Sequence, residues 1–285
     1  MLLVVDVGNT QTVVGVYAEK DAPSIPATAQ PTSEKHAETL RRIRELQMPL
    51  ASWRISTCKQ DTADDIRAKA IPLARMARID VNNIHAVALA SVVPALTQAW
   101  ADAVTAHGRT PMDVRLCTAA TAEAAGLFAT DYPNPREIGA DRVADAVAAR
   151  ALFGSPCVVV DFGTATNIEV IGADGKFLGG IIAPGMETGA SALFSHATKL
   201  AAIGMEAPPQ VIGLSSEEAM QSGIILGEAA RVDGLVKRIF EQIGCSGAVV
   251  ATGGLAPLVA EHSVEITDVL PELTLEGLRL IARTQ

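Results

Sequence analysis

The sequence predicts an α/β protein built from two similar domains, each with a central sheet flanked by helices. The first observation is an apolar run, residues 2–5, that leads directly into Asp6-Val7-Gly8. The second is the recurrence of this pattern, in which the apolar run 158–160 leads into Asp161-Phe162-Gly163. The third is the length of 285 residues, which is enough for two domains of ordinary size. We therefore expect a duplicated module.

The first copy has the composition of a buried strand that ends in a binding turn. Its apolar run does not alternate with polar residues, so both faces of the strand should be covered. Asp6 ends the run, and a buried carboxylate is costly unless a cation or hydrogen-bond donors accompany it. Gly8 allows the backbone to approach a ligand, and Thr10 and Gln11 can donate hydrogen bonds to phosphate oxygens. The alternative is a strand followed by an ordinary turn.

The second copy repeats these features, with Asp161 and Thr164 in the positions of Asp6 and Thr10. A second strand follows each turn. Two such turns that face each other would form a cleft for a nucleotide with its metal. The usual phosphate loop G-x-x-x-x-G-K-[ST] and the dinucleotide motif G-x-G-x-x-G are absent from the sequence. We place the domain boundary at 118/119, which gives domains 1–118 and 119–285.

The remaining elements follow from periodicity, proline and glycine positions and capping residues. Strands are expected at 12–17, 51–57, 86–93, 114–118, 167–171, 177–182 and 248–251. Helices are expected after Ser33, at 62–78 with a weak point at Pro72, and at 96–107, 143–153, 216–243 and 273–282. Ser215 with Glu218 should form a capping box, and Thr274 should cap the last helix. Gly223 and Gly227 would be explained by close packing or by a nearby ligand.

Two further segments contain residues suited to binding. Thr252-Gly253-Gly254 follows a strand and precedes a helix, so its amides are able to hold an adenosine or phosphate group; a plain glycine turn is the alternative. In Gly139-Ala140-Asp141-Arg142 an acid and a guanidinium meet where a proline-rich loop enters a helix. Asp141 either accepts a proton from a substrate hydroxyl or is merely an N-cap, which would lower its pKa.

Composition excludes several classes of function. A net charge of −9 argues against nonspecific nucleic-acid binding, and no apolar run is long enough to cross a membrane. The sequence lacks the features of a signal peptide, so we expect a cytoplasmic protein. The four cysteines are scattered without a C-x-x-C pair, which indicates reduced thiols, and none of the five histidines is paired at metal-ligand spacing.

Taken together, these segments resemble the type III pantothenate kinases, a family within the superfamily of actin, hexokinase and acetate kinase. The resemblance extends over nearly the whole chain, at residues 6–10, 53–57, 91–94, 132–135, 139–142, 161–166, 179–185, 220–223 and 252–257. It implies two RNase H-like domains with mixed five-stranded sheets flanked by helices, in an actin-like ATPase architecture. It also implies ATP-dependent phosphorylation of pantothenate to 4′-phosphopantothenate, the first step of coenzyme A biosynthesis.

On the nucleotide side, the resemblance implies that Asp6 helps to hold Mg²⁺ and that Asp161 binds a monovalent cation, K⁺ or NH₄⁺. The residues implied to contact ATP are Gly8, Asn9, Thr10, Gln11 and Thr164, and Gly253 and Gly254 form the third candidate nucleotide turn.

On the substrate side, the resemblance implies that Asp141 is the catalytic base. The implied pantothenate contacts are Tyr132, Gly139, Ala140, Asp141 and Arg142. Members of the family are homodimers whose pantothenate pocket is completed by the partner subunit. Apolar positions in 216–243 and after Gly185 offer a surface for such a dimer.

The chain departs from the family pattern in three places: a longer segment at 18–50, the run Asn167-Ile168-Glu169, and Asp145 where many members have Asn. Two other functions stay open, a regulatory or accessory protein with the same fold and a kinase for another small hydroxyl compound. The three acids Asp6, Asp141 and Asp161 favour an enzyme, because a binding module would not need all of them.

Overall fold

The computed structural model describes residues 1–18, 48–105, 112–196 and 203–284. They form two compact units. Unit 1 comprises Met1–Leu152 together with Glu272–Gln285, and unit 2 comprises Phe153–Pro271. The expected boundary at 118/119 separates the two sheets, and as a domain boundary it stays a prediction.

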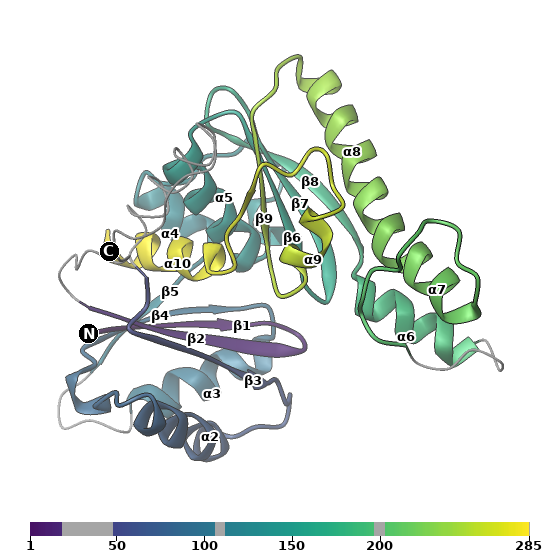
Figure 1. The fold of residues 1–285 in the computed structure, drawn as a ribbon. Coiled ribbons are helices and arrows are strands. Elements are labelled where there is room, and N and C mark those ends of the chain that lie inside the picture. Colours follow the sequence, from purple (N-terminus) through teal and green to yellow (C-terminus); the bar gives the residue numbers. More distant parts are fainter. Residues whose placement is uncertain (19–47, 106–111, 197–202, 285) are drawn as a thin grey trace, which may run out of the picture. The chain divides into compact units, whose positions relative to one another are not determined.

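Unit 1 contains a mixed five-stranded sheet in the order β3-β2-β1-β4-β5 (Figure 1). β1 (Leu2–Val7) pairs antiparallel with β2 (Gln11–Tyr17), which pairs antiparallel with β3 (Ala51–Ser56). β4 (Ala86–Ser91) runs parallel to β1, and β5 (Asp113–Leu116) runs parallel to β4. The central strands β1 and β4 are buried on both faces, as their continuous apolar runs predict.

Helices cover both faces of this sheet. α2 (Ala63–Met76), which continues through Pro72, and α3 (Pro94–Thr105) share one apolar cluster with the sheet residues Leu3, Val5 and Val7. α10 (Leu273–Arg283) packs on β1, β2 and β4 from the other face. The first unit is therefore closed by a helix from the far end of the sequence.

α10 also contacts α5 (Ala140–Phe153) closely within unit 1. A methyl group on Gly277 would lie 1.9 Å from the carbonyl oxygen of Ala144, so only glycine allows this approach. The expectation that Thr274 caps α10 is wrong, because the N-cap residue is Glu272. Thr274 lies inside the helix, where its hydroxyl donates to Asp145 Oδ1 at 2.7 Å.

Unit 2 repeats the topology of unit 1, with the sheet order β10-β9-β6-β7-β8. The strands β6 (Cys157–Phe162), β7 (Ala165–Ile171) and β8 (Phe177–Pro184) are antiparallel neighbours. β9 (Ala248–Thr252) runs parallel to β6, and the short β10 (Asp268–Val269) runs parallel to β9. Two mixed five-stranded sheets with the same pairing pattern and flanking helices confirm the predicted fold class.

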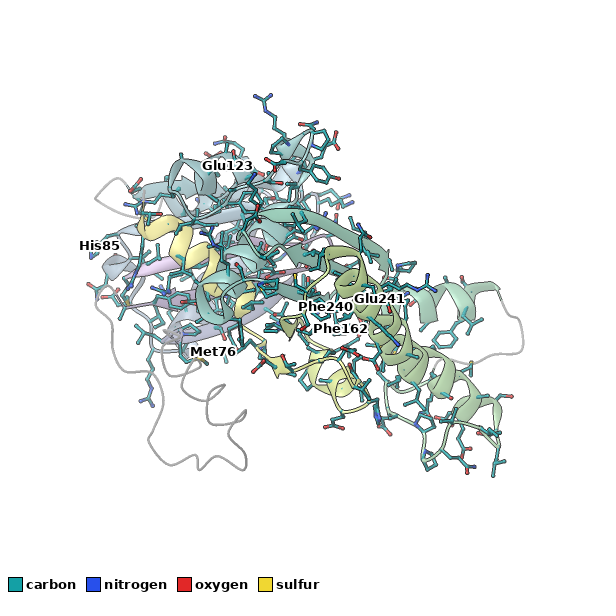
Figure 2. The ribbon with its side chains drawn as sticks, turned by 90° about the horizontal axis from the view of Figure 1, so that it is seen from above. Met76, His85, Glu123, Phe162, Phe240 and Glu241 are labelled. Atoms are coloured by element: carbon teal, nitrogen blue, oxygen red, sulfur yellow. The ribbon has the colours of Figure 1, made fainter. Side chains whose placement is uncertain are left out.

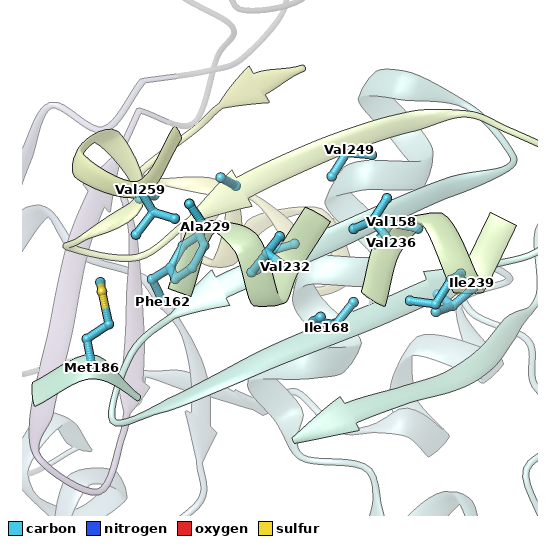
Figure 3. Close-up of a cluster of buried hydrophobic side chains, with 14 of the residues drawn as sticks. Val158, Phe162, Ile168, Met186, Ala229, Val232, Val236, Ile239, Val249 and Val259 are labelled. Carbon is cyan, nitrogen blue, oxygen red and sulfur yellow. The ribbon is translucent and has the colours of Figure 1, made fainter. Parts of the chain in front are cut away.

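The long helical segment of unit 2 consists of α7 (Ser216–Gln221), a π-helical stretch η3 (Ser222–Leu226) and α8 (Gly227–Ile243). One face of α8 packs on the sheet in the main apolar cluster of the unit (Figure 3). The helix residues of this cluster include Ala229, Val232, Val236 and Ile239, and the sheet residues include Val158 and Ile168.

Two details of this segment differ from expectation. Ser215 caps α7 by accepting from the Glu218 amide at 3.1 Å, but Glu218 Oε2 accepts from the Leu214 amide at 2.7 Å, so the reciprocal half of the capping box is missing. Close packing does not explain the two glycines. Among the described residues, an added methyl group would meet nothing within 4 Å at Gly223 and only a carbonyl oxygen at 3.9 Å at Gly227.

Several short elements were not predicted, since they lack a long periodic pattern. They are η1 (Val81–Asn83), α4 (Ala119–Ala124), η2 (Pro135–Glu137) and α6 (Met186–His196). The helix expected after Gly254 is confirmed as α9 (Ala256–Ala260). The helix expected after Ser33 lies outside the described residues. Among the described helices, none has the length and apolar character needed to span a bilayer.

Candidate active site

The first binding turn joins β1 to β2 in unit 1. The Gly8 amide donates to the Gln11 carbonyl at 3.1 Å, which closes the turn. A methyl group on Gly8 would lie 2.8 Å from the same carbonyl oxygen, so a side chain there would force the turn open. Asn9, Thr10 and Gln11 are exposed, and Asp6 is half-buried at the carboxyl end of its strand. The turn thus presents polar groups to solvent from a rigid sheet.

Asp141 lies next to the same edge of that sheet. A methyl group on Gly139 would come within 3.6 Å of the Val92 side chain, which follows the end of β4. The Val92 amide in turn donates to the Val7 carbonyl at 3.0 Å, directly after Asp6. The structure therefore brings the Asp6 turn and the start of α5 together at the carboxyl ends of two parallel strands.

Asp141 is not the N-cap of α5. The helix begins at Ala140, and the carbonyl of Gly139 accepts the first helical hydrogen bond, from the Val143 amide at 3.1 Å. Asp141 thus belongs to the first turn, where Oδ1 accepts from the amide of Arg142 at 2.8 Å. The N-cap interpretation is therefore wrong.

The surroundings of Asp141 also alter its acidity. Burial raises the pKa of the Asp141 carboxyl above its usual range. The hydrogen bond from the Arg142 amide and the charge of the Arg142 guanidinium lower this pKa, but their effect is smaller than that of burial. A raised pKa makes this carboxylate a stronger base than an exposed aspartate.

Gly139 leaves room for the Asp141 carboxylate in its present orientation. A methyl group on Gly139 would lie 2.4 Å from Asp141 Oδ1. Tyr132, in the loop that precedes α5, is exposed, and its amide donates to the Thr130 hydroxyl at 3.0 Å. Arg142 is half-buried and Ala140 is half-buried beside it.

The second binding turn joins β6 to β7 in unit 2 and is held by groups from after β8. The Gly163 amide donates to the Ala165 carbonyl at 3.0 Å, while the Thr164 carbonyl accepts from the Gly185 amide at 3.1 Å and from the Thr188 hydroxyl at 2.7 Å. A methyl group on Gly185 would lie 2.3 Å from the Gly163 carbonyl oxygen. The start of α6 therefore locks the backbone of this turn.

The glycine turn after β9 lies against the second acid. Gly253 has a φ of +91°, and a methyl group there would lie 2.7 Å from Asp161 Oδ1 and 2.5 Å from the Phe162 carbonyl oxygen. Only glycine allows this conformation and this approach. Gly254 follows and is exposed. Asp161, Thr164 and Gly253 are thus gathered at one edge of the second sheet.

Sequence reasoning missed Val92, Gly185 and Thr188 as parts of these two sites. Val92 lies within segment 91–94 and Gly185 ends segment 179–185. Both segments carry the family resemblance, but the sequence did not indicate which contacts these two residues make. Thr188 carries no local signal, because its hydroxyl reaches a carbonyl 24 positions earlier in the chain.

The described residues contain no group of three or more His, Cys, Asp or Glu side chains arranged to hold a metal ion. Any cation at these turns would therefore share its coordination among single carboxylates, backbone carbonyls, water and ligand oxygens, as Mg²⁺ at phosphate sites usually does. The four cysteines are free, and burial raises the pKa of the Cys117 and Cys157 thiols to about 12.

Comparison with solved structures identifies the fold. A Campylobacter jejuni protein described as a Baf family transcriptional activator matches with a TM-score of 0.51 and 16% identity, over 99% of this chain and 97% of that chain. A reductive activator for a corrinoid, iron-sulfur protein matches with a TM-score of 0.50 and 11% identity, over 99% of this chain and 60% of that one. At such identities the likeness concerns the fold alone.

Comparison of sequences identifies the family. The family model described as "Type III pantothenate kinase" matches residues 2–238. The type III pantothenate kinase of Koribacter versatilis is 37% identical over 99% of this chain and 94% of that protein. The type III pantothenate kinase of Desulfosudis oleivorans is 38% identical over 99% of this chain and 98% of that protein. The one of Acidothermus cellulolyticus is 39% identical over 99% of this chain and 97% of that protein. The chain belongs to the type III pantothenate kinase family.

Proposed function

We propose that this chain transfers the γ-phosphoryl group of ATP to the primary hydroxyl of pantothenate with Asp141 as the general base. Family membership makes it an ATP-dependent phosphotransferase of coenzyme A biosynthesis that uses a divalent metal. The observation that carries the assignment of the base is the position of Asp141, beside the Asp6 turn at the carboxyl ends of β1 and β4 and with a raised pKa.

In the proposed reaction, the pantothenate oxygen attacks the γ-phosphorus while the bond from that phosphorus to the ADP oxygen breaks. The hydroxyl proton passes to the Asp141 carboxylate late in this process, because phosphoryl transfer is largely dissociative. Tyr132, Gly139, Ala140 and Arg142 are proposed to hold pantothenate. The enzyme's contribution is then mainly orientation and charge stabilisation.

The first turn fits a nucleotide with Mg²⁺. Its half-buried Asp6 is a hard oxygen ligand of the kind that Mg²⁺ prefers, and its exposed polar residues are suited to phosphate oxygens. We propose that Asp6 helps to hold Mg²⁺ and that Gly8, Asn9, Thr10 and Gln11 contact the ATP phosphates. Bound there, the ion would neutralise charge on the phosphates.

The second turn fits a monovalent cation. Asp161 Oδ1 and the Phe162 carbonyl oxygen both lie beside Gly253, which gives two oxygen donors in one place. We propose that Asp161 binds K⁺ or NH₄⁺ here and that Thr164, Gly253 and Gly254 contact ATP. A bound cation would offset negative charge close to the phosphates.

We further propose that the protein is a homodimer. Unit 2 exposes apolar side chains next to the segments expected to form the interface, and Val211, Ile212 and Leu214 before α7 are 72%, 79% and 82% exposed. Sedimentation equilibrium should give twice the chain mass. A fully active monomer would refute this proposal.

A cytoplasmic location is proposed as well. Cys58 and Cys245 are free and half-buried, which suits a reducing compartment.

One assay tests the central proposal. Purified protein is incubated with ATP, Mg²⁺ and pantothenate in potassium and in sodium buffers, and 4′-phosphopantothenate is identified by mass spectrometry. We expect the product to form, and to form faster with K⁺. If no product appears in either buffer while related hydroxyl compounds are phosphorylated, the substrate assignment fails.

A further inference from the structure

Unit 2 contains an ion pair that the proposed reaction does not use, formed by the buried Glu228 and by Arg231, whose side chain is 34% exposed. Glu228 lies in the first turn of α8, and its side chain is only 5% exposed. Glu228 Oε2 contacts Arg231 Nη2 at 2.5 Å, one turn along the helix. Glu228 Oε1 accepts a hydrogen bond from the Thr166 hydroxyl at 2.7 Å, and Arg231 Nη2 donates to the Pro184 carbonyl at 3.2 Å. The pair therefore connects α8 to both β7 and β8.

The position of Glu228 would suit an apolar residue equally well. Glu228 precedes Val232 and Val236 on the helix face that packs on the sheet, and both valines are fully buried in the apolar cluster (Figure 3). Even a fully buried ion pair is often replaced by apolar residues without loss of stability, so packing energy does not account for this partly exposed pair. What an apolar residue could not provide is the set of hydrogen bonds to the two strands.

Those two strand ends hold the second binding turn. Thr166 lies opposite Phe162 in the β6–β7 ladder, and Pro184 lies opposite Ala165 in the β7–β8 ladder. Directly after Pro184, the Gly185 amide donates to the Thr164 carbonyl. A shift of either strand end would therefore move the turn that carries Asp161 and Thr164.

We infer that Glu228 and Arg231 are positioning residues for the Asp161–Thr164 turn: they fix the ends of β7 and β8 so that this turn keeps the geometry needed for phosphate and cation binding. The inference rests on the proposed role of the turn. The π-helical stretch η3 ends just before α8, and such stretches are frequent at functional sites.

The experiment compares variants of the full-length protein. Glu228→Met keeps the length of the side chain but removes the acceptor for the Thr166 hydroxyl and the partner of Arg231, and Arg231→Leu removes the link to Pro184. The matched controls are Glu241→Met and Arg238→Leu, which change exposed residues of the same helix (Figure 2 labels Glu241). Binding of MgATP is measured by calorimetry without pantothenate. Steady-state turnover gives the K⁺ concentration for half-maximal activation and the KM values for ATP and for pantothenate.

For the two test variants we expect the Kd for MgATP and the K⁺ requirement to rise by about tenfold to a hundredfold, the range found for outer partners of ion sites. The KM for pantothenate should change by less than about twofold, because its proposed contacts belong to unit 1. The controls should match the parent in every measurement. A merely structural role would lower Tm without this selective loss.

Two outcomes would overturn the inference. One is a folded Glu228→Met protein whose Kd for MgATP and K⁺ requirement stay within about twofold of the parent values. The other is an equal rise in both KM values. If Arg231→Leu does not fold, Thr166→Val removes one hydrogen bond with little change in shape and takes its place. A parent protein that binds MgATP but does not phosphorylate pantothenate refutes the proposed function, and the binding data still test the positioning role.

Discussion

Replacing Asp141 with asparagine separates catalysis from stability at the proposed base. Asparagine keeps the size of the side chain and its acceptor for the Arg142 amide, but it cannot take up a proton. General bases contribute about 10²- to 10⁴-fold in rate, or roughly 3 to 5 kcal/mol of barrier. We therefore expect kcat to fall by this factor. The KM for pantothenate should change much less, because the amide can still accept or donate a hydrogen bond.

The stability of this variant follows from the pKa of Asp141. Because burial raises the pKa in the folded protein, the contribution of Asp141 to stability is complete below the unfolded-state pKa and is lost as pH rises through the folded-state value. Asparagine does not ionise, so the variant does not lose this stability at neutral pH. The first-turn position acts the other way, since the helix dipole favours a negative charge there by about 0.3 to 1 kcal/mol. We expect the free energy of unfolding to change by less than about 1 kcal/mol, the scale of these opposing terms.

The assay measures kcat, KM and Tm for parent and variant between acidic and neutral pH. For the parent, kcat should fall on the acid side at a higher pH than for an exposed aspartate, and the variant should lack this limb. A variant with unchanged Tm and a kcat within about threefold of the parent would remove Asp141 from the mechanism, because threefold is only about 0.7 kcal/mol.

Three further substitutions test other parts of the site. Gly139→Ala places a methyl group 2.4 Å from Asp141 Oδ1, and the movable carboxylate can turn away from it. We therefore expect kcat to fall more than about tenfold while Tm stays close to that of the parent, and an unchanged kcat would contradict this. Gly277→Ala should lower the free energy of unfolding by about 1 to 3 kcal/mol, because the methyl group meets the Ala144 backbone at 1.9 Å, and denaturant unfolding checks this. Asp161→Asn should abolish activation by K⁺ and NH₄⁺ over Na⁺, and a retained preference in steady-state rates would refute the cation assignment.

The two binding turns were predictable because their signals are local. A strand, an acid and a glycine within a few residues define where the backbone turns and which groups it presents, and the repeat of that pattern predicted two sheets of one topology. The start of α5 was harder to predict. Gly139 and not Asp141 supplies the first helical carbonyl, a shift of two residues in the start of the helix, and sequence patterns resolve helix ends poorly.

Long-range contacts account for most of what the sequence could not predict. Thr274 looks like a cap by residue type, yet its hydroxyl bonds Asp145, 129 positions away. Glu228 and Arg231 have the spacing of an ordinary i, i+3 ion pair, and nothing local indicates that the Thr166 hydroxyl donates to Glu228 or that the Pro184 carbonyl accepts from Arg231. Such roles depend on which strands pack under the helix, and local periodicity does not contain that information.

The return of α10 to unit 1 has a consequence for the order in which the chain folds. Unit 2 is one continuous stretch, whereas the core of unit 1 needs Leu273, Leu278 and Ile281, which are fully buried and come from the other side of that stretch. During synthesis, all of unit 2 leaves the ribosome before these residues do. Unit 1 is therefore the first unit to be synthesised and the last to be completed. Until α10 is added, β1 and β4 expose the apolar face that this helix later covers.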